Sequence, residues 1–357
     1  MNVARGALRA PRDNWRLCVA PMMDWTDRHC RYFHRLLAPS ARLYTEMLTT
    51  GAVLHGDRNW LLGFDPAEHP VALQLGGSEP EALAEAASIG AEAGFDEINL
   101  NCGCPSDRVQ KGRFGACLMT EPERVGDCVA AMREAVALPV TVKCRIGVDE
   151  HDDDDFLQRF AESLVGAGVD ALIVHARKAW LQGLSPKQNR EVPPLAPARV
   201  ERLAAAFPEL PVVFNGGLTC VGAAADALTR FDGVMLGRAA YQTPWVLAEL
   251  EALLRRPNEP GGRRPREIVE AMSEYSRHAI QQGVPLRAVA RHMLGLFHAC
   301  PGARGWRRVL SQNMHRADAG PELLLEALRI VETSADSSQN RCPPAGVRTR
   351  SGFLDRS

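Results

Sequence analysis

The chain has 357 residues, of which 46% are hydrophobic and 24% charged, and its formal net charge is −1. These values are ordinary for a globular protein, and the length accommodates a barrel of ordinary size with a small second domain. No apolar run approaches the length of a transmembrane helix, which excludes an integral membrane protein built on such helices.

The first 15 residues are predicted to be a flexible lead. They carry Arg5, Arg9 and Arg12 but lack the apolar core of a secretory signal, so a frayed lead is favoured over an organelle transit peptide. Ten cysteines are scattered along the chain, mostly within apolar segments. This pattern is typical of reduced thiols in the cytoplasm and not of a disulfide framework.

Eight short apolar segments predict β-strands, at residues 17–22, 43–47, 71–76, 97–103, 140–147, 171–177, 212–217 and 233–238. Several are nearly continuous apolar runs, as in strands buried on both faces. Helix-like stretches lie between most of them, at residues 79–94, 121–137, 155–167, 198–207 and 220–229. This alternation implies parallel strands with right-handed crossovers. Eight such units favour an α/β fold, a closed (β/α)₈ TIM barrel, over an open doubly wound sheet.

Composition sets the predicted domain boundaries. Residues 16–254 form the barrel, residues 255–266 a Pro- and Gly-rich linker, residues 267–334 a small all-helical domain, and residues 335–357 a disordered tail. Between residues 255 and 316 there are twelve arginines, four glutamates and no lysine, a charge of about +8 against about −9 elsewhere. This asymmetry indicates a polyanionic partner at one end of the molecule, with an arginine-rich surface that binds nothing as the alternative.

The predicted strands end in unusually polar residues, and in TIM barrels the chemistry lies at these carboxyl ends. The residues there are Pro21, Met22, Met23, Asp24, Glu46, Gln74, Asn99 to Cys104, Lys143, Arg145, His175, Arg177, Asn215, Gly216, Gly217, Gly237 and Arg238. A solvated side chain explains one such residue but explains the whole set poorly.

Glycines after the last two strands predict a phosphate site. Asn215-Gly216-Gly217 follows the seventh strand and Gly237-Arg238 the eighth, where barrels commonly bind phosphate through bare backbone amides. Arg238 can add charge-assisted hydrogen bonds. The chain has no Walker loop and no strand-linked GxGxxG motif, which disfavours a nucleoside triphosphate or a Rossmann-bound dinucleotide.

The remaining strand ends offer cations, an amide and a thiol. Lys143 and Arg145 are two residues apart in an extended strand and share a face, so with His175 they project toward the mouth. A cation there can stabilise the anionic ring of a reduced flavin. Lys143 could instead form a Schiff base, but that chemistry would not need Cys104 or a basic tail. Gln74 offers its amide to a heterocycle edge, and the Cys104 thiol can donate a proton.

Several of these segments closely resemble the tRNA-dihydrouridine synthases. They are APMMDWTD at residues 20–27, QLGG at 74–77, NLNCGCPS at 99–106 and HARK at 175–178. The runs YTEM at 44–47, GLSPKQNRE at 183–191 and RHMLGLF at 291–297 resemble the bacterial A subfamily of that family. The resemblance extends over about residues 15–320.

The resemblance implies a flavoenzyme in which NADPH reduces FMN, the reduced FMN passes a hydride to C6 of a uridine, and a cysteine protonates C5. On this mapping Cys104 is the proton donor, Asn101 and Arg145 hold the uracil, and no metal takes part. FMN is held by Pro21, Met22, Met23, Gln74, Lys143, His175, Asn215, Gly216, Gly217, Gly237 and Arg238. Lys187, Arg190, Arg304 and Arg307 meet the tRNA.

The resemblance also implies a tRNA clamped between the barrel and the helical domain, with positions 20 and 20a of the D-loop as the targets. It implies no membrane association and no stable protein partner. A target uridine must leave its stack to reach the flavin. Arg304, Arg307 and Arg308 are expected at the tRNA backbone, with Trp306 among them stacking on a base.

Two features need a separate interpretation. Cys102 stands where the family usually has an apolar residue; with no CxxC motif to complete a metal site, it is interpreted as a small buried residue. The acidic run at 149–155 lacks the spacing of a calcium loop and is interpreted as a solvated loop that begins a helix.

Two other functions stay open. One is an FMN barrel reductase acting on a small free pyrimidine or another heterocycle, which leaves the basic helical domain unexplained. The other is a tRNA-binding protein that has lost its chemistry, against which the presence of Cys104, Lys143, Arg145 and His175 argues.

Overall fold

The computed structural model describes residues 12–255 and 262–336. By the density of their contacts, the described residues divide into two units: residues 12–32 and 41–237 form the first, and residues 33–40 with those from 238 onward form the second. The helices over residues 238–254, which we expected in the barrel domain, therefore group with the helical region. Most of the predicted lead and tail, and half of the linker, lie outside the described residues.

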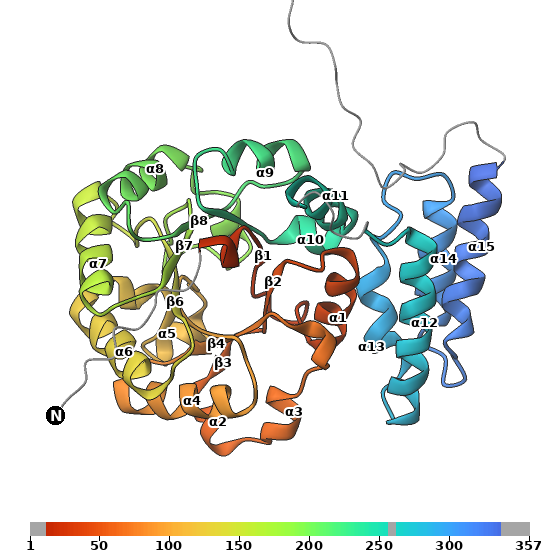
Figure 1. The fold of residues 1–357 in the computed structure, drawn as a ribbon, viewed down its shortest axis with the longest axis horizontal. Helices are drawn as coiled ribbons and strands as arrows, with labels where there is room; N and C mark the ends of the chain where they lie inside the picture. The colour runs from red at the N-terminus through yellow and green to blue at the C-terminus, as the bar shows by residue number, and fades with distance from the viewer. Residues whose placement is uncertain (1–11, 256–261, 337–357) are drawn as a thin grey trace, which may run out of the picture. The chain divides into compact units, whose positions relative to one another are not determined.

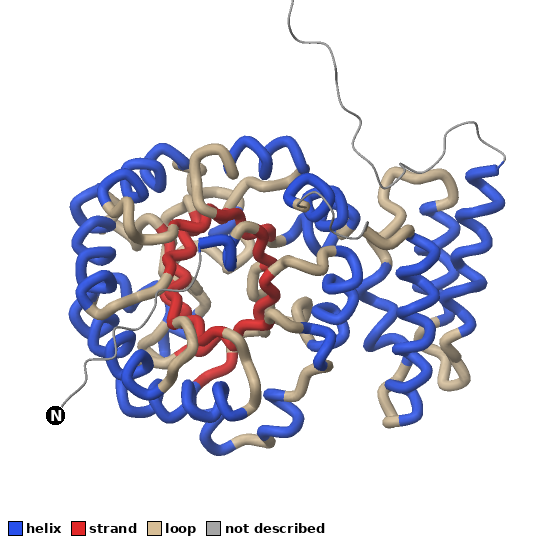
Figure 2. Tube along the Cα trace, in the orientation of Figure 1, coloured by secondary structure: helices blue, strands red, loops and turns tan. Residues whose placement is uncertain are grey.

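The first unit is built on one sheet of nine strands (Figure 1). They are β1 (Leu17–Val19), β2 (Arg42–Tyr44), β3 (Leu48–Thr49), β4 (Val71–Gly76), β5 (Glu97–Cys102), β6 (Val140–Arg145), β7 (Ala171–His175), β8 (Val212–Asn215) and β9 (Gly233–Leu236). All neighbours are parallel, and pairing of β2 with β4 closes the order β2-β1-β9-β8-β7-β6-β5-β4-β3. Figure 2 shows the closed ring of strands. The predicted TIM barrel is confirmed.

The second predicted strand is interrupted in the structure. β2 ends at Tyr44 and β3 begins at Leu48, and both pair with β4. At the break, the backbone N–H of Gln74 donates to the Thr45 hydroxyl (3.0 Å) and not to a backbone carbonyl of the neighbouring strand. The Thr45 side chain thus replaces one backbone hydrogen bond between neighbouring strands. Two short strands, β2 and β3, together occupy the second strand position of the barrel.

The five predicted helices are present to within about two residues at each end, as α4 (Pro80–Glu92), α6 (Pro122–Ala135), α7 (Asp154–Gly166), α8 (Pro197–Ala206) and α9 (Val221–Ala227). The acidic run begins α7, because the Asp153 carboxylate accepts a hydrogen bond from Phe156 N (2.6 Å) as its N-cap. The first unit also contains η1 (Arg12–Trp15), η2 (Pro66–Glu68), η3 (Gly115–Thr120), η4 (Gln188–Arg190), α2 (Thr50–His55), α3 (Arg58–Leu62) and α5 (Asp107–Lys111). α1 (Arg28–Leu37) begins in the first unit and ends in the second.

The inside of the barrel is filled at its lower levels by a buried cluster. Its members are Trp15, Cys18, Ala20, Tyr44, Ala72, Ala171, Ile173, Val213 and Met235. Trp15 comes from η1, within the segment expected to be a flexible lead, and its side chain is fully buried. This mostly apolar cluster lies beside buried polar side chains, since Trp15 and Tyr44 both donate hydrogen bonds to Glu97.

The second unit contains α10 (Arg238–Gln242), α11 (Trp245–Leu254), α12 (Pro265–Gln281), α13 (Leu286–Ala290), η5 (Arg291–Met293), α14 (Ala303–Asn313) and α15 (Glu322–Asp336). Helices α12 and α14 both pack on α15, and Figure 1 shows the three side by side. Trp306, Leu310 and Leu324 are buried in this unit. Each helix described in residues 12–255 and 262–336 is too short or too polar to cross a membrane.

Candidate active site

Strand register brings the polar strand ends together at the carboxyl end of the barrel, which we call the mouth. Asn101 of β5 pairs with Lys143 of β6, Arg145 of β6 pairs with His175 of β7, and His175 pairs with Asn215 of β8. Residues in register on neighbouring strands lie side by side, so four adjacent strands supply one continuous polar surface.

The mouth concentrates positive charge in a buried setting. Burial, assisted by the Arg145 cation, lowers the pKa of Lys143 to about 8, and burial lowers the pKa of Arg145 to about 10. The pKa of His175 falls well below its usual value, through burial first and then through Arg145, Lys143, Arg177 and Arg190. Asn215 Oδ1 accepts a hydrogen bond from Lys143 Nζ (3.1 Å). Cations gathered in a setting that lowers their pKa values make a site suited to an anion.

Lys143→Met is expected to stabilise the ligand-free protein near pH 7. The pKa of Lys143 is about 8 in the folded protein and 10.5 ordinarily, so between these values the unfolded chain binds more protons. The buried ammonium group therefore destabilises the fold less and less as the pH rises between these two pKa values. Below the lower value its full destabilising effect is present. At neutral pH the unfolding free energy of the variant should exceed that of the wild type by roughly 1–3 kcal/mol. The variant should also lack the increase in unfolding free energy that this lysine gives the wild type as the pH rises.

Urea unfolding of both proteins at about pH 7 and about pH 10 measures this effect. Lys187→Met, at an exposed position, is the matched control and should leave the unfolding free energy nearly unchanged. The same pH dependence in Lys143→Met and the wild type would contradict the burial cost assigned to this ammonium.

A short loop after β5 presents the Cys104 thiol. Asn101 Oδ1 accepts hydrogen bonds from the backbone N–H groups of Gly103 (3.1 Å) and Cys104 (3.0 Å). The Cys104 Sγ lies 3.5 Å from Ser106 Oγ and is partly exposed. Cys102 and Cys144 are fully buried, and burial raises the pKa of Cys102 well above its usual value and that of Cys144 to about 12. Of these three cysteines, only Cys104 is partly exposed.

Arg145 ties this loop to the long segment that follows β7. Its Nε donates to Gly103 O (2.8 Å), and its Nη1 donates to Lys178 O (3.1 Å) and Asn189 O (2.9 Å). Nη2 makes no hydrogen bond with a residue in the described ranges. Arg145 therefore positions both loops while one nitrogen remains for a ligand.

The Gln74 amide is held by two neighbours on β5. Its Nε2 donates to Asn99 Oδ1 (2.7 Å), and its Oε1 accepts from Asn101 Nδ2 (2.9 Å). One Nε2–H bond is left over, since a primary amide has two such donors. The Gln74 amide is thus held in a fixed orientation at the mouth, and one of its N–H groups is available to a heterocycle.

Glycine is required where the chain leaves β8. Gly216 and Gly217 have φ of +117° and +69°, and a Cβ on Gly216 would lie 3.1 Å from His175 Cδ2. Only glycine lets the backbone turn this close to His175 and present bare amides. Gly237 follows β9. A Cβ added at this glycine would lie 4.0 Å from Met22 Sδ. Arg238 is the first residue of α10 and belongs to the second unit.

The loop after β1 carries the three remaining predicted flavin contacts. The Met22 carbonyl accepts hydrogen bonds from Trp25 N (3.0 Å) and Thr26 N (2.9 Å), which fold the loop into a turn. Pro21 and Met22 are half-buried, whereas Met23 is 56% exposed. Met23 is among the few exposed large apolar side chains of the described residues, as expected of a position that a ligand covers.

The predicted tRNA-contacting residues are exposed. Lys187 and Arg190 lie in the segment after β7, and Arg304, Arg307 and Arg308 lie on one face of α14. In residues 262–336, these three α14 arginines make no ion pair. Four other arginines of the second unit do, namely Arg264, Arg266, Arg277 and Arg316.

The expectation that Trp306 stacks on a base of the tRNA is wrong. The indole is fully buried, donates its Nε1–H to Met293 O (3.0 Å), and meets the Phe297 ring edge-on. Ala303 and Leu310 share its helix face and are also buried. This face of α14 belongs to the core, and the arginines occupy the opposite one.

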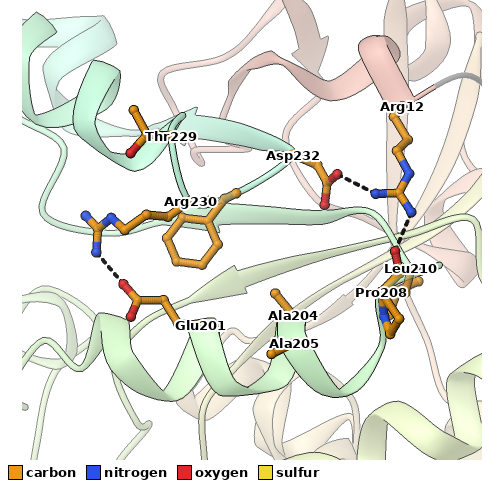
Figure 3. A pocket seen from close by; sticks show the side chains of 10 residues that line it. Arg12, Glu201, Ala204, Ala205, Pro208, Leu210, Thr229, Arg230 and Asp232 are labelled. Atoms are coloured by element: carbon orange, nitrogen blue, oxygen red, sulfur yellow. Dashed lines mark hydrogen bonds and ion pairs between the residues drawn. The ribbon is translucent and has the colours of Figure 1, made fainter.

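A hollow of about 430 Å³, drawn in Figure 3, lies elsewhere on the barrel. Its lining includes Leu210, just before β8, and Asp232, just before β9, so it lies at the amino ends of the strands. Its arginines are engaged, Arg12 with Asp232 (3.0 Å) and Arg230 with Glu201. The hollow is therefore remote from the mouth. Nowhere in the described ranges do three or more His, Cys, Asp or Glu side chains gather as a metal site.

Comparison with known proteins gives a consistent result. The family model described as dihydrouridine synthase (Dus) matches residues 18–332. A protein of Xanthomonas axonopodis pv. citri (strain 306) named tRNA-dihydrouridine(20/20a) synthase is 59% identical over 319 residues, covering 89% of this chain and 94% of that protein. Proteins of the same name from Vibrio vulnificus (strain CMCP6) and Yersinia pestis are 53% and 52% identical over 323 and 320 residues, covering 90% and 89% of this chain and 98% and 92% of theirs.

Proposed function

Because this chain belongs to the dihydrouridine synthase family, we propose that it reduces uridines 20 and 20a in the D-loop of tRNA to 5,6-dihydrouridine. The observation that carries the proposal is a mouth lined by buried cations and reached by one partly exposed thiol. Saturating the C5–C6 bond of a uracil requires a hydride at one carbon and a proton at the other. The tRNA substrate is our reason for placing the reaction in the cytoplasm.

FMN is the cofactor we propose for the mouth, with NADPH as its reductant. When bound, reduced FMN supplies the hydride for C6 of the uracil. Lys143, Gln74 and His175 would hold its ring system, and the loop of Pro21, Met22 and Met23 would cover it. Asn215, Gly216, Gly217, Gly237 and Arg238 would hold its ribityl phosphate. The chemistry of this set fits the group, since buried cations favour an anionic ring and bare amides favour a phosphate.

Cys104 is the proposed proton donor to C5. A thiol S–H can give up its proton as a general acid when carbanion character develops at the neighbouring carbon. Asn101 and Arg145 fix the loop that carries the thiol, through Oδ1 of the first and Nε of the second. The remaining Nη2 of Arg145 and second Nδ2–H of Asn101 are the groups we assign to the uracil oxygens.

Two sets of exposed cations would hold the tRNA. Lys187 and Arg190 are placed beside the mouth by the segment that Arg145 anchors. Arg304, Arg307 and Arg308 form a basic face on α14 with no carboxylate drawing on them in residues 262–336. The guanidinium groups of Arg304, Arg307 and Arg308 are suited to phosphate oxygens, and a free pyrimidine would not need them.

Dihydrouridine mapping on unmodified tRNA tests the proposal. Purified protein, FMN and NADPH are incubated with the transcript, and we expect product at positions 20 and 20a. Heat-treated protein and a transcript with cytidines at both positions are the controls. Flavin in the protein without product on tRNA would favour a reductase acting on a small free pyrimidine, and product at other positions would overturn the assigned specificity.

A further inference from the structure

We propose that Glu97, deep inside the barrel, is a positioning residue that acts on Cys104 through a directional chain of hydrogen bonds. This inference rests on the proposed function, because it is Cys104 as proton donor that the chain would position. The chain begins at three buried polar side chains that the proposed chemistry does not itself use, namely Glu97, Thr141 and Asn99, and reaches the mouth at Gln74 and Asn101.

Glu97 begins β5 and its side chain is fully buried inside the barrel. Its carboxylate accepts hydrogen bonds from Trp15 Nε1 (2.8 Å) and Tyr44 OH (2.8 Å) and lies 3.3 Å from Arg42 Nη1. The Thr141 hydroxyl also donates to it, with 2.5 Å between Oγ1 and Oε1. An indole N–H, a phenol and a hydroxyl thus converge on the carboxylate, with a guanidinium beside it.

From Thr141 the hydrogen bonds continue upward to the loop of the thiol. Thr141 Oγ1 accepts from Asn99 Nδ2 (2.8 Å), and Asn99 Oδ1 accepts from Gln74 Nε2 (2.7 Å). Gln74 Oε1 then accepts from Asn101 Nδ2 (2.9 Å). Asn101 Oδ1 accepts from the backbone N–H groups of Gly103 and Cys104. The chain thus joins the barrel floor to the residue that carries the thiol without a gap.

The carboxylate gives this chain its direction. The Thr141 hydroxyl has a single hydrogen, which it donates downward to Glu97, so its oxygen accepts from Asn99 above. Asn99 must then turn its NH₂ toward Thr141 and its oxygen toward Gln74. Gln74 and Asn101 are set in turn by the same rule. The last oxygen in the series therefore faces the two N–H groups of the loop.

Reversal of the chain would end in a clash of donors. With the three amides turned over, Asn101 would point its NH₂ at the N–H groups of Gly103 and Cys104. The loop would lose both hydrogen bonds that begin it, and the thiol would lose its fixed place over the mouth. Small displacements of a reacting group are costly, which makes orientation of these amides a requirement for the proton transfer.

Thr141→Val breaks the chain at its first step and is the test. The change removes one hydroxyl at nearly constant volume and leaves the Glu97–Arg42 ion pair in place, whereas removing Glu97 would strand a buried arginine. Thr141→Ser keeps the hydroxyl and is the matched rescue. The readouts are dihydrouridine formation on tRNA in a single turnover and the rate of Cys104 alkylation by iodoacetamide, followed by mass spectrometry.

In Thr141→Val we expect product formation to fall ~10- to 100-fold and Cys104 alkylation to change by roughly threefold or more as the loop loosens. Thr141→Ser should match the wild type in both readouts. Cys102 and Cys144 are fully buried and report on general opening of the barrel. They should stay unmodified in both variants.

Wild-type alkylation of Cys104 in Thr141→Val would overturn the proposal. Alkylation of Cys144 in parallel with Cys104 would also overturn it, because the effect would then be a general loss of structure. The proposed function fails separately, if the wild-type protein forms no dihydrouridine. In that event the alkylation comparison still decides whether Thr141 sets the position of the loop.

Discussion

Cys104→Ala is expected to lower dihydrouridine formation on tRNA by at least ~100-fold, the usual scale of a positioned proton donor. The side chain ends a loop held by Asn101 and Arg145, so its removal takes away the thiol without disturbing the hydrogen bonds of the backbone. FMN should remain bound, and NADPH oxidation should continue, because neither depends on the thiol. The measurements are product mapping on tRNA, the visible flavin spectrum, and NADPH consumption.

Cys102→Ala is the matched control for this substitution. Its thiol is two residues away on the same segment, fully buried, and has a pKa that burial raises well above the usual value. We expect product formation within about threefold of the wild type and a loss of stability of about 1 kcal/mol. Full product formation by Cys104→Ala, with loss of product in Cys102→Ala, would transfer the proton-donor role to Cys102.

The barrel could be predicted from the sequence because its strands are buried on both faces. Runs such as residues 71–73 and 171–174 are apolar throughout, which distinguishes them from the amphipathic helices between them. The short helices were not predicted, because a helix of five or six residues has too few turns to show a period. α2 and α3 are marked only by their N-caps, Thr49 and Asp57.

The mouth was predictable for a simpler reason, namely that parallel strands bring their carboxyl ends to one side. The position of each polar residue at a strand end therefore placed it near the others. What the sequence could not supply was the partner of each group. The family resemblance implies that Arg145 holds the substrate, and in the structure Arg145 also joins the loop of Gly103 to the segment of Lys178 and Asn189. Such contacts depend on the conformation of loops, which no periodic pattern in the sequence predicts.

Two further signals in the sequence indicate which side chains are buried. In β5 the residues Glu97, Asn99 and Asn101 alternate with apolar ones, a period of two that places three polar side chains inside the barrel. On α14, Ala303, Trp306 and Leu310 recur at helical spacing and mark a core face. That spacing predicts a buried Trp306, which is why the expectation of base stacking by this residue is wrong.

Arg304→Ala combined with Arg307→Ala is expected to weaken tRNA binding about 100-fold. Each guanidinium would lose a charge-assisted contact of about 1.5 kcal/mol or more, and every 1.4 kcal/mol is about tenfold in affinity. The slope of log affinity against log salt should become shallower by about 2, one for each lost phosphate contact. Binding of unmodified tRNA, followed by fluorescence anisotropy at several salt concentrations, measures both quantities.

Arg266→Ala combined with Arg277→Ala removes the same formal charge from the same unit. These arginines are already paired, Arg266 with Glu270 and Glu332 and Arg277 with Glu274 and Glu322. If only the total charge of the helical unit attracted tRNA, both double variants would weaken binding equally and would share one salt slope. A large loss confined to the α14 pair requires direct contact by that face. Equal losses of tRNA affinity in the two double variants would mean that the helical unit attracts tRNA only through its total charge. Recognition of the tRNA would then belong to the barrel.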